Sequence, residues 1–140
     1  MITLDQAKTM VRVAREKGSE LGLKPLSVAV LDAGGHLLAF EREDGASPGR
    51  FEIARGKAYG AVMLGMPGSA QMARAEDQAY FMAAANGAFG GKVVPVPGGV
   101  LVKDASGEVI GAVGVTGDTS DNDAKAAMAG IEAAGLIGVA

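Results

Sequence analysis

One pattern occurs twice in this chain of 140 residues: an apolar run, the turn sequence Asp-Ala-x-Gly, and a second apolar run. The first copy, "VLDAGGHLLAFER", occupies residues 30–42, and the second, "VLVKDASGEVIGAVGV", occupies residues 100–115. Asp and Gly favour tight turns, so each copy predicts a β-hairpin. Hairpins pair neighbouring strands antiparallel, which is not the β-α-β alternation of a doubly wound fold. We therefore expect residues 1–140 to form a single layered α+β domain whose central antiparallel sheet is built from two hairpins.

Helices are expected to pack on this sheet, because apolar and small residues recur at helical spacing outside the hairpins. They lie within residues 2–23, 47–65, 69–91 and 116–136. Thr3 and Gln6 form a capping box at the start of the first helix. Ser47 is expected to cap the second helix. Pro95 and Pro97 confine the segment before the second hairpin to a sheet edge or a loop.

The charge and the composition exclude several classes of function. A net charge of −3, with both signs mixed along the chain, provides no basic surface for nucleic acid or an anionic membrane. The absence of cysteine excludes disulfides, thiolate catalysis and cysteine-ligated metals. The N-terminal residues lack a signal-peptide pattern, and no apolar stretch approaches the ~18 residues of a membrane span. We expect a cytoplasmic protein that binds neither nucleic acid nor a membrane.

Four separated motifs, in order along nearly the whole chain, resemble the GlcG/HbpS family, which includes the C-terminal domain of PduO-type proteins. They are "VAVLDAGGHLLAFEREDGA" (28–46), "RGKAYGA" (55–61), "PGGVLVKDASGEVIGAVGVTG" (97–117) and "SDNDAKAAMAG" (120–130). The resemblance implies a compact domain with a central antiparallel sheet, homo-oligomers such as octamers, and haem as a possible cofactor. The chain departs from the family at Glu43, where methionine is common, and at 92–97, where a longer glycine-rich segment is common.

His36 is the only histidine, and it directly follows the turn of the first hairpin. A neutral imidazole is a good axial ligand for haem iron and a good general base near neutral pH. His36 is therefore our candidate metal ligand and a candidate catalytic residue, although a residue at this place is also often simply exposed. If haem binds elsewhere, Tyr59, Tyr80 or a methionine must supply the ligand.

Lys57 lies at the margin of the apolar face of the second expected helix. There it could hold a haem propionate or a substrate carboxylate, or act as a base with a lowered pKa. The alternative is that its stem packs along the helix while the amine reaches water.

Arg42 and Asp44 lie in "REDGA", just before the second helix. Arg42 could bind a carboxylate, and Asp44 could act as a general base or orient Lys57, although an Asp-Gly turn accounts for part of this motif. Gly98 and Gly99 could let a flat ligand or a neighbouring chain approach the backbone, or could simply form a bend. The acidic run at 118–123 lacks the pattern of a calcium loop, so we expect it to cap a helix.

Two functions from different classes remain open. The first is a haem-binding protein for sequestration, sensing or degradation, with a pocket near a subunit interface and with His36, Arg42, Lys57, Gly98 and Gly99 as candidate contacts. The second is a lyase or tautomerase acting on a carboxylated or carbonyl small molecule. In that enzyme Arg42 and Lys57 would hold the anion, and His36 or Asp44 would carry the proton. An oligomeric accessory protein without catalysis is a third possibility.

Overall fold

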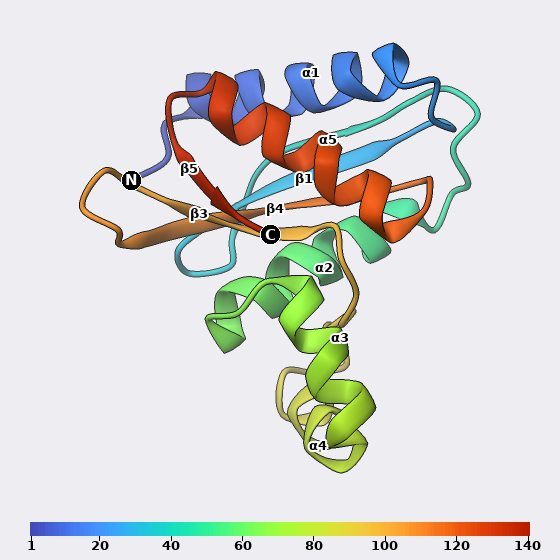
Figure 1. The fold of residues 1–140 in the computed structure, drawn as a ribbon, viewed down its shortest axis with the longest axis vertical. Coiled ribbons are helices and arrows are strands. Elements are labelled where there is room, and N and C mark those ends of the chain that lie inside the picture. The colour runs from blue at the N-terminus through green and yellow to red at the C-terminus, as the bar shows by residue number, and fades with distance from the viewer.

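The computed structural model describes residues 1–140 as five helices and one five-stranded antiparallel sheet in the order β2-β1-β4-β3-β5 (Figure 1). The elements are α1 (Leu4–Glu20), β1 (Ser27–Asp32), β2 (Leu37–Arg42), α2 (Arg50–Leu64), α3 (Gly68–Asp77), α4 (Ala79–Ala88), β3 (Gly99–Lys103), β4 (Val109–Thr116), α5 (Ser120–Ala133) and β5 (Ile137–Val139). The predicted α+β fold, with a central antiparallel sheet formed by two hairpins, is confirmed. No helix is both long enough and apolar enough to span a bilayer.

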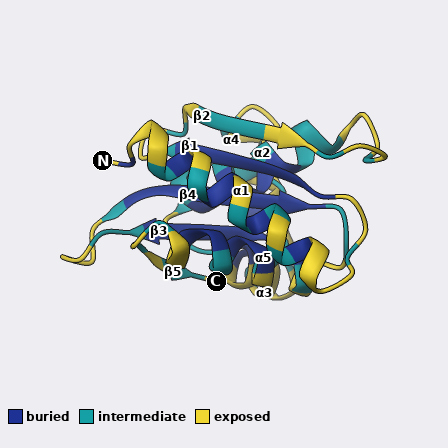
Figure 2. Cartoon of the chain, turned by 90° about the horizontal axis from the view of Figure 1, so that it is seen from above, coloured by how far each residue is buried: buried dark blue, intermediate teal, exposed yellow.

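The helices cover the two faces of the sheet unequally. α1 and α5 lie side by side on one face, α2 lies on the other, and α3 and α4 extend away from the sheet as an arm (Figure 1). The larger core lies between the sheet and the α1–α5 layer, and it includes Met10, Val113 and Ile131. The central strands are buried along most of their length (Figure 2). The ends of the strands are therefore where a ligand can reach polar groups.

The two hairpin turns are built in the same way. In the first, one carboxylate oxygen of Asp32 accepts the amides of Gly34 and His36, each at 2.9 Å. In the second, Asp104 accepts the amides of Ser106 and Glu108 at 2.9 and 3.0 Å. These bonds satisfy the amides of the turn and fix where the return strand begins.

The start of α2 differs from the prediction. The capping box of Thr3 and Gln6 is present at the start of α1, but Ser47 does not cap α2. α2 begins at Arg50, with Gly49 before it, and the Ser47 hydroxyl accepts a bond from the Arg50 side chain. The hydroxyl is occupied by a side-chain donor, so it does not bind the helix amides.

The arm and the C-terminus also differ from the prediction. The single helix expected over residues 69–91 is divided at Gln78, whose φ of −133° and ψ of 65° are not helical. Residues 92–98 form a loop, which is one of the two alternatives predicted from Pro95 and Pro97. The short strand β5, which pairs with β3, was not predicted, because three residues after a helix carry too little pattern to show which sheet edge they reach.

Small residues let α2 lie directly against the sheet. Ala54, Ala58 and Ala61 are fully buried, as the small-residue face predicted. A Cβ atom on Gly114 of β4 would overlap the carbonyl oxygen of Ala54. This close approach brings the side chains of α2 to the end of β4.

Candidate functional site

His36 lies at the turn between β1 and β2, and its side chain is 81% exposed. Its Nδ1 atom is 3.3 Å from the Asp32 carboxylate oxygen that accepts the two turn amides. The amide of His36 is the largest cause that lowers the pKa of Asp32, so this carboxylate stays ionised. Asp32 can therefore hold a proton on Nδ1, which leaves Nε2 as a free lone pair facing solvent.

A cavity of about 460 Å³ lies beside His36, between the two hairpin turns and the N-terminus. It is lined by Met1, Ile2, Asp32, Ala33, Gly34, Leu38, Asp104, Glu108, Val109 and Ile110. Leu37, the residue after His36, is 48% exposed. An imidazole, an exposed leucine and a cavity lined by both apolar side chains and the carboxylates of Asp32, Asp104 and Glu108 thus lie at the same end of the sheet.

These residues fit the axial ligation of a haem. A metal-ligating histidine usually donates its other ring N–H to a carboxylate, as His36 can do to Asp32. No group of three or more His, Asp or Glu side chains could hold a bare metal ion. Haem iron needs only an axial ligand from the protein, because the porphyrin supplies the other nitrogen atoms. His36 is so exposed that the cover for a haem face must come from another surface.

Lys57 is not at the margin of a helix face but deeply buried, with 3% of its side chain exposed. Its Nζ donates to the carbonyl oxygen of Val115 at 3.0 Å and to Asp123 Oδ2 at 3.1 Å. Asp123, 1% exposed, also accepts the Asp118 amide at 3.0 Å. Burial lowers the pKa of Lys57, and the charge of Asp123 opposes that effect. Burial likewise raises the pKa of Asp123, and Lys57 opposes it.

Gly98 and Gly99 lie against Lys57. A Cβ atom on Gly98 would be 2.8 Å from Lys57 Nζ, and one on Gly99 would overlap the Lys57 carbonyl. The two glycines therefore make room for the lysine and for the backbone of α2. Direct contact of either glycine, or of Lys57, with a ligand stays a prediction.

The structure does not bring together the residues of the predicted enzyme cluster. Arg42 and Asp44 are exposed and form no ion pair, and Lys57 is oriented by Asp123 and not by Asp44. β2 separates His36 from Arg42, and six residues of strand span about 20 Å. Roles for Arg42 and Asp44 in ligand binding stay predictions, but they cannot act on one small substrate together with His36 of the same chain.

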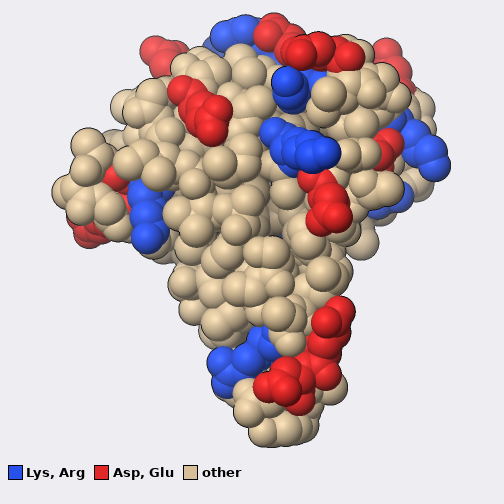
Figure 3. All heavy atoms as spheres, in the orientation of Figure 1, with Lys and Arg blue, Asp and Glu red and all other residues tan.

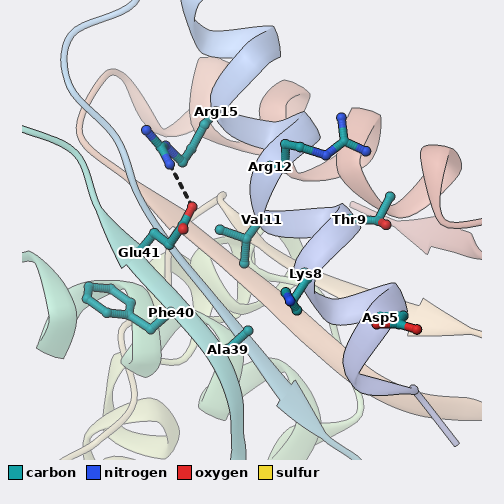
Figure 4. A pocket seen from close by; sticks show the side chains of 9 residues that line it. All are labelled: Asp5, Lys8, Thr9, Val11, Arg12, Arg15, Ala39, Phe40 and Glu41. Carbon is teal, nitrogen blue, oxygen red and sulfur yellow. Dashed lines mark hydrogen bonds and ion pairs between the residues drawn. The ribbon is translucent and has the colours of Figure 1, made fainter.

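The largest cavity, about 670 Å³, is a groove between α1 and β2 (Figure 4). Its lining residues are Asp5, Lys8, Thr9, Val11, Arg12, Arg15, Ala39, Phe40 and Glu41. Arg15 closes one side by pairing with Glu41 at 2.7 Å, and the Phe40 ring points away from α1. No histidine, tyrosine or methionine lines this groove, so it offers no usual ligand for haem iron.

Asp123 is the site residue that the sequence interpretation missed. Thr119 caps α5 as the acidic run predicted, but Asp123 lies one turn further, in line with the buried Ala126, Ala127 and Gly130. The sequence feature that could have revealed Asp123 is a carboxylate on the apolar face of a helix, because a buried carboxylate needs a buried partner. The partner itself lies 66 residues away along the chain.

Comparison with known proteins agrees with this fold along most of the chain. Residues 2–132 match the family model HbpS-like, described as "Haem degrading protein HbpS-like". The uncharacterized 15.0 kDa protein of the dhaT–dhaS intergenic region of Citrobacter freundii is 33% identical over 122 residues, covering 87% of this chain and 84% of that protein.

Two solved structures share the fold. The crystal structure of HbpS has a TM-score of 0.81 and 31% identity, covering 93% of this chain and 87% of that chain. The crystal structure of a PduOC:heme complex has a TM-score of 0.84 and 24% identity, covering 96% of this chain and 95% of that chain. The resemblance drawn from the four sequence motifs is confirmed, and the chain belongs to the HbpS-like family of haem-degrading proteins.

Proposed function

We propose that this protein binds haem and sequesters, senses or degrades it, with His36 Nε2 as the axial ligand of the iron. Membership of the HbpS-like family and 31% identity to HbpS support haem as the ligand. The observation that carries the assignment to His36 is its 3.3 Å contact with Asp32, which leaves Nε2 free. Bound haem supplies an iron centre for oxygen or redox chemistry, and the protein supplies binding and orientation.

Asp32 performs the positioning step. Its carboxylate is fixed by the amides of Gly34 and His36, so it cannot easily rotate away from the imidazole. A proton held on Nδ1 selects the tautomer that has its lone pair on Nε2. Leu37, the first residue of β2, is 48% exposed and offers apolar surface at the same turn as His36.

The pocket is completed, in this proposal, by a second copy of the chain. One protomer leaves the His36 imidazole and Leu37 largely open to water, which is a poor environment for an apolar macrocycle. A homo-oligomer that covers this end of the sheet would exclude water from the haem face. The family resemblance implies an octamer, and the expected location is the cytoplasm.

Hemin titration followed by absorbance tests the proposal. Wild-type protein is expected to give a saturable, shifted Soret band, which His36→Ala loses or alters. Asp32→Asn is expected to weaken the band, since it removes the charge that supports the imidazole. Asp121→Asn is the control, because it makes the same change at an exposed carboxylate that lies outside the histidine turn and the cavity beside it. If His36→Ala binds hemin with an unchanged spectrum, His36 is not the ligand. If wild-type protein leaves the hemin spectrum unperturbed, haem binding itself is wrong.

A further inference from the structure

A small cavity of about 240 Å³ lies at the end of the sheet opposite to His36. Three loops form it, and its lining residues are Lys24, Pro25, Gly45, Ala46, Ser47, Arg50 and Gly117. The first two precede β1, the next three connect β2 to α2, Arg50 is the first residue of α2, and Gly117 follows β4. About 20 Å of strand separates this cavity from the histidine turn, so it is a different place from the proposed haem site.

Arg50 is the partly buried cation of this cavity. Its Nε donates to the Ser47 hydroxyl at 3.1 Å, and its Nη1 donates to the Thr116 hydroxyl at 2.8 Å. Both acceptors are uncharged, and no carboxylate lies within ion-pairing distance of Arg50. A guanidinium has five N–H donors in a planar fork, so donors remain for a further acceptor. Two hydroxyls therefore hold the guanidinium in place without neutralising it.

Two carboxylates near this cavity already have other partners. Asp123 is paired with Lys57. Asp118 accepts the backbone amide of Lys24 at 3.0 Å and the Asn122 side chain at 2.9 Å. Lys24 adds a second positive charge to the lining of the cavity. Asp44, which precedes Gly45 in the chain, does not pair with Arg50 either, so the Arg50 guanidinium has no counter-ion within ion-pairing distance.

A second, independent feature is the hydroxyl of Ser27. Ser27 is fully buried, and its Oγ has no hydrogen-bond partner. It lies directly opposite Thr116 in the β1–β4 pairing, so the two hydroxyls share one face of the sheet. A buried polar atom without a partner costs free energy unless a bound group satisfies it. Ser27 itself does not line the cavity, but its unused hydroxyl lies across the strand pair from Thr116, the residue that holds Arg50.

We propose that this cavity binds the carboxylate of a small organic acid, with Arg50 as the recognising residue. Guanidinium and carboxylate match in charge and in planar geometry. The volume is below the ~300–1,000 Å³ of pockets for drug-sized ligands, so the acid must be small. The proposal does not depend on haem binding, because it uses none of the residues near His36.

Calorimetric titration of the full chain with sodium acetate at constant ionic strength tests this. Wild-type protein is expected to bind acetate saturably and acetamide, the uncharged match, not at all. Arg50→Gln is expected to weaken acetate binding about tenfold or more, since a charge-assisted pair is lost. Lys125→Gln, which removes an exposed cation that does not line this cavity, is expected to bind acetate like wild type. Absence of acetate binding, or equal binding by Arg50→Gln, would overturn the proposal.

Further variants and measurements show whether a loss of acetate binding comes from the arginine itself, from unfolding or from a haem-binding role of the arginine. Arg50→Lys keeps the charge but loses the planar fork, and it is expected to bind acetate with intermediate affinity. Circular dichroism checks that each variant is folded. Hemin binding is expected to be unchanged in Arg50→Gln. If that variant loses hemin affinity while wild type ignores acetate, the arginine binds a haem propionate and the free-acid proposal is overturned.

Discussion

Lys57 Nζ of α2 and Asp123 Oδ2 of α5 lie 3.1 Å apart, although the two helices cover opposite faces of the sheet. The Lys57 side chain lies beside Gly98, and its Nζ also donates to the carbonyl oxygen of Val115, the penultimate residue of β4. One buried ion pair therefore ties together both helix layers and the end of the central strand. Removing either charge leaves the other buried without a counter-ion.

Lys57→Met is expected to lower the free energy of unfolding by roughly 3–5 kcal/mol, because it leaves the Asp123 carboxylate buried and unpaired. Asp123→Leu is expected to cost a similar amount. The double variant should lose less than the sum, since neither charge then remains. Urea denaturation measures the free energy of unfolding of the two single variants and of the double variant. Strictly additive losses would show that the two side chains do not stabilise each other.

Gly114→Ala is expected to destabilise the fold by about 1–3 kcal/mol, as overpacking of a close helix–sheet contact does. The added methyl group would overlap the carbonyl oxygen of Ala54 in α2, which is backbone and cannot move independently of the helix. Gly49→Ala is the matched control, because nothing lies within 4 Å of its added Cβ and its φ is −78°. That variant should be neutral or slightly stabilising. Thermal unfolding of the two variants tests this prediction. Equal melting temperatures of Gly114→Ala and Gly49→Ala would contradict the packing argument.

Acid sensitivity should depend in part on Asp118. The Asn122 side chain, followed by the amides of Lys24 and Thr119, lowers the pKa of Asp118 from 3.8 to about 2. A lowered carboxyl pKa means that the ionised form stabilises the folded state, fully above the unfolded pKa. This contribution is lost as the pH falls through about 2. The difference in melting temperature between wild type and Asp118→Asn should be constant above pH 5 and shrink below pH 4. A difference that does not change with pH would contradict the lowered pKa.

The arm formed by α3 and α4 is the surface that we expect to mediate self-association. No charged residue occurs between Gln78 and Lys92, Tyr80 is 73% exposed, and Met82 is the buried residue of α4. Figure 3 shows a nearly charge-free band between the sheet body and the charges near the tip of the arm. An uncharged, exposed helix of this kind is typical of an interface.

Light scattering at micromolar concentration is expected to show an oligomer for the wild-type chain. Tyr80→Glu should lower its mass, because a charge at the interface would be desolvated on association. Leu21→Glu, on an exposed position far from the arm, serves as control. A monomeric wild-type protein would contradict self-association and with it the pocket shared between protomers.

The sequence by itself determined the features that depend on near neighbours in the chain. The capping box of Thr3 and Gln6 spans three residues, and the turn at Asp32 closes through amides two and four residues away. The matching turn at Asp104 follows the same chemistry. Local turn residues and apolar runs were enough to predict the hairpins and the antiparallel sheet, and the resemblance of four sequence motifs indicated the family.

Only the tertiary structure decided which side chains meet at the candidate sites. Lys57 pairs with Asp123, and Arg50 donates a hydrogen bond to Thr116; in each pair the two residues are 66 positions apart in the chain. No local spacing encodes such partners, because their position depends on how closely α2 can approach β4. In the folded protein the Lys57–Asp123 pair is buried away from water. The strength of this ion pair and the pKa values of its two groups therefore depend on the whole structure and not on the local sequence.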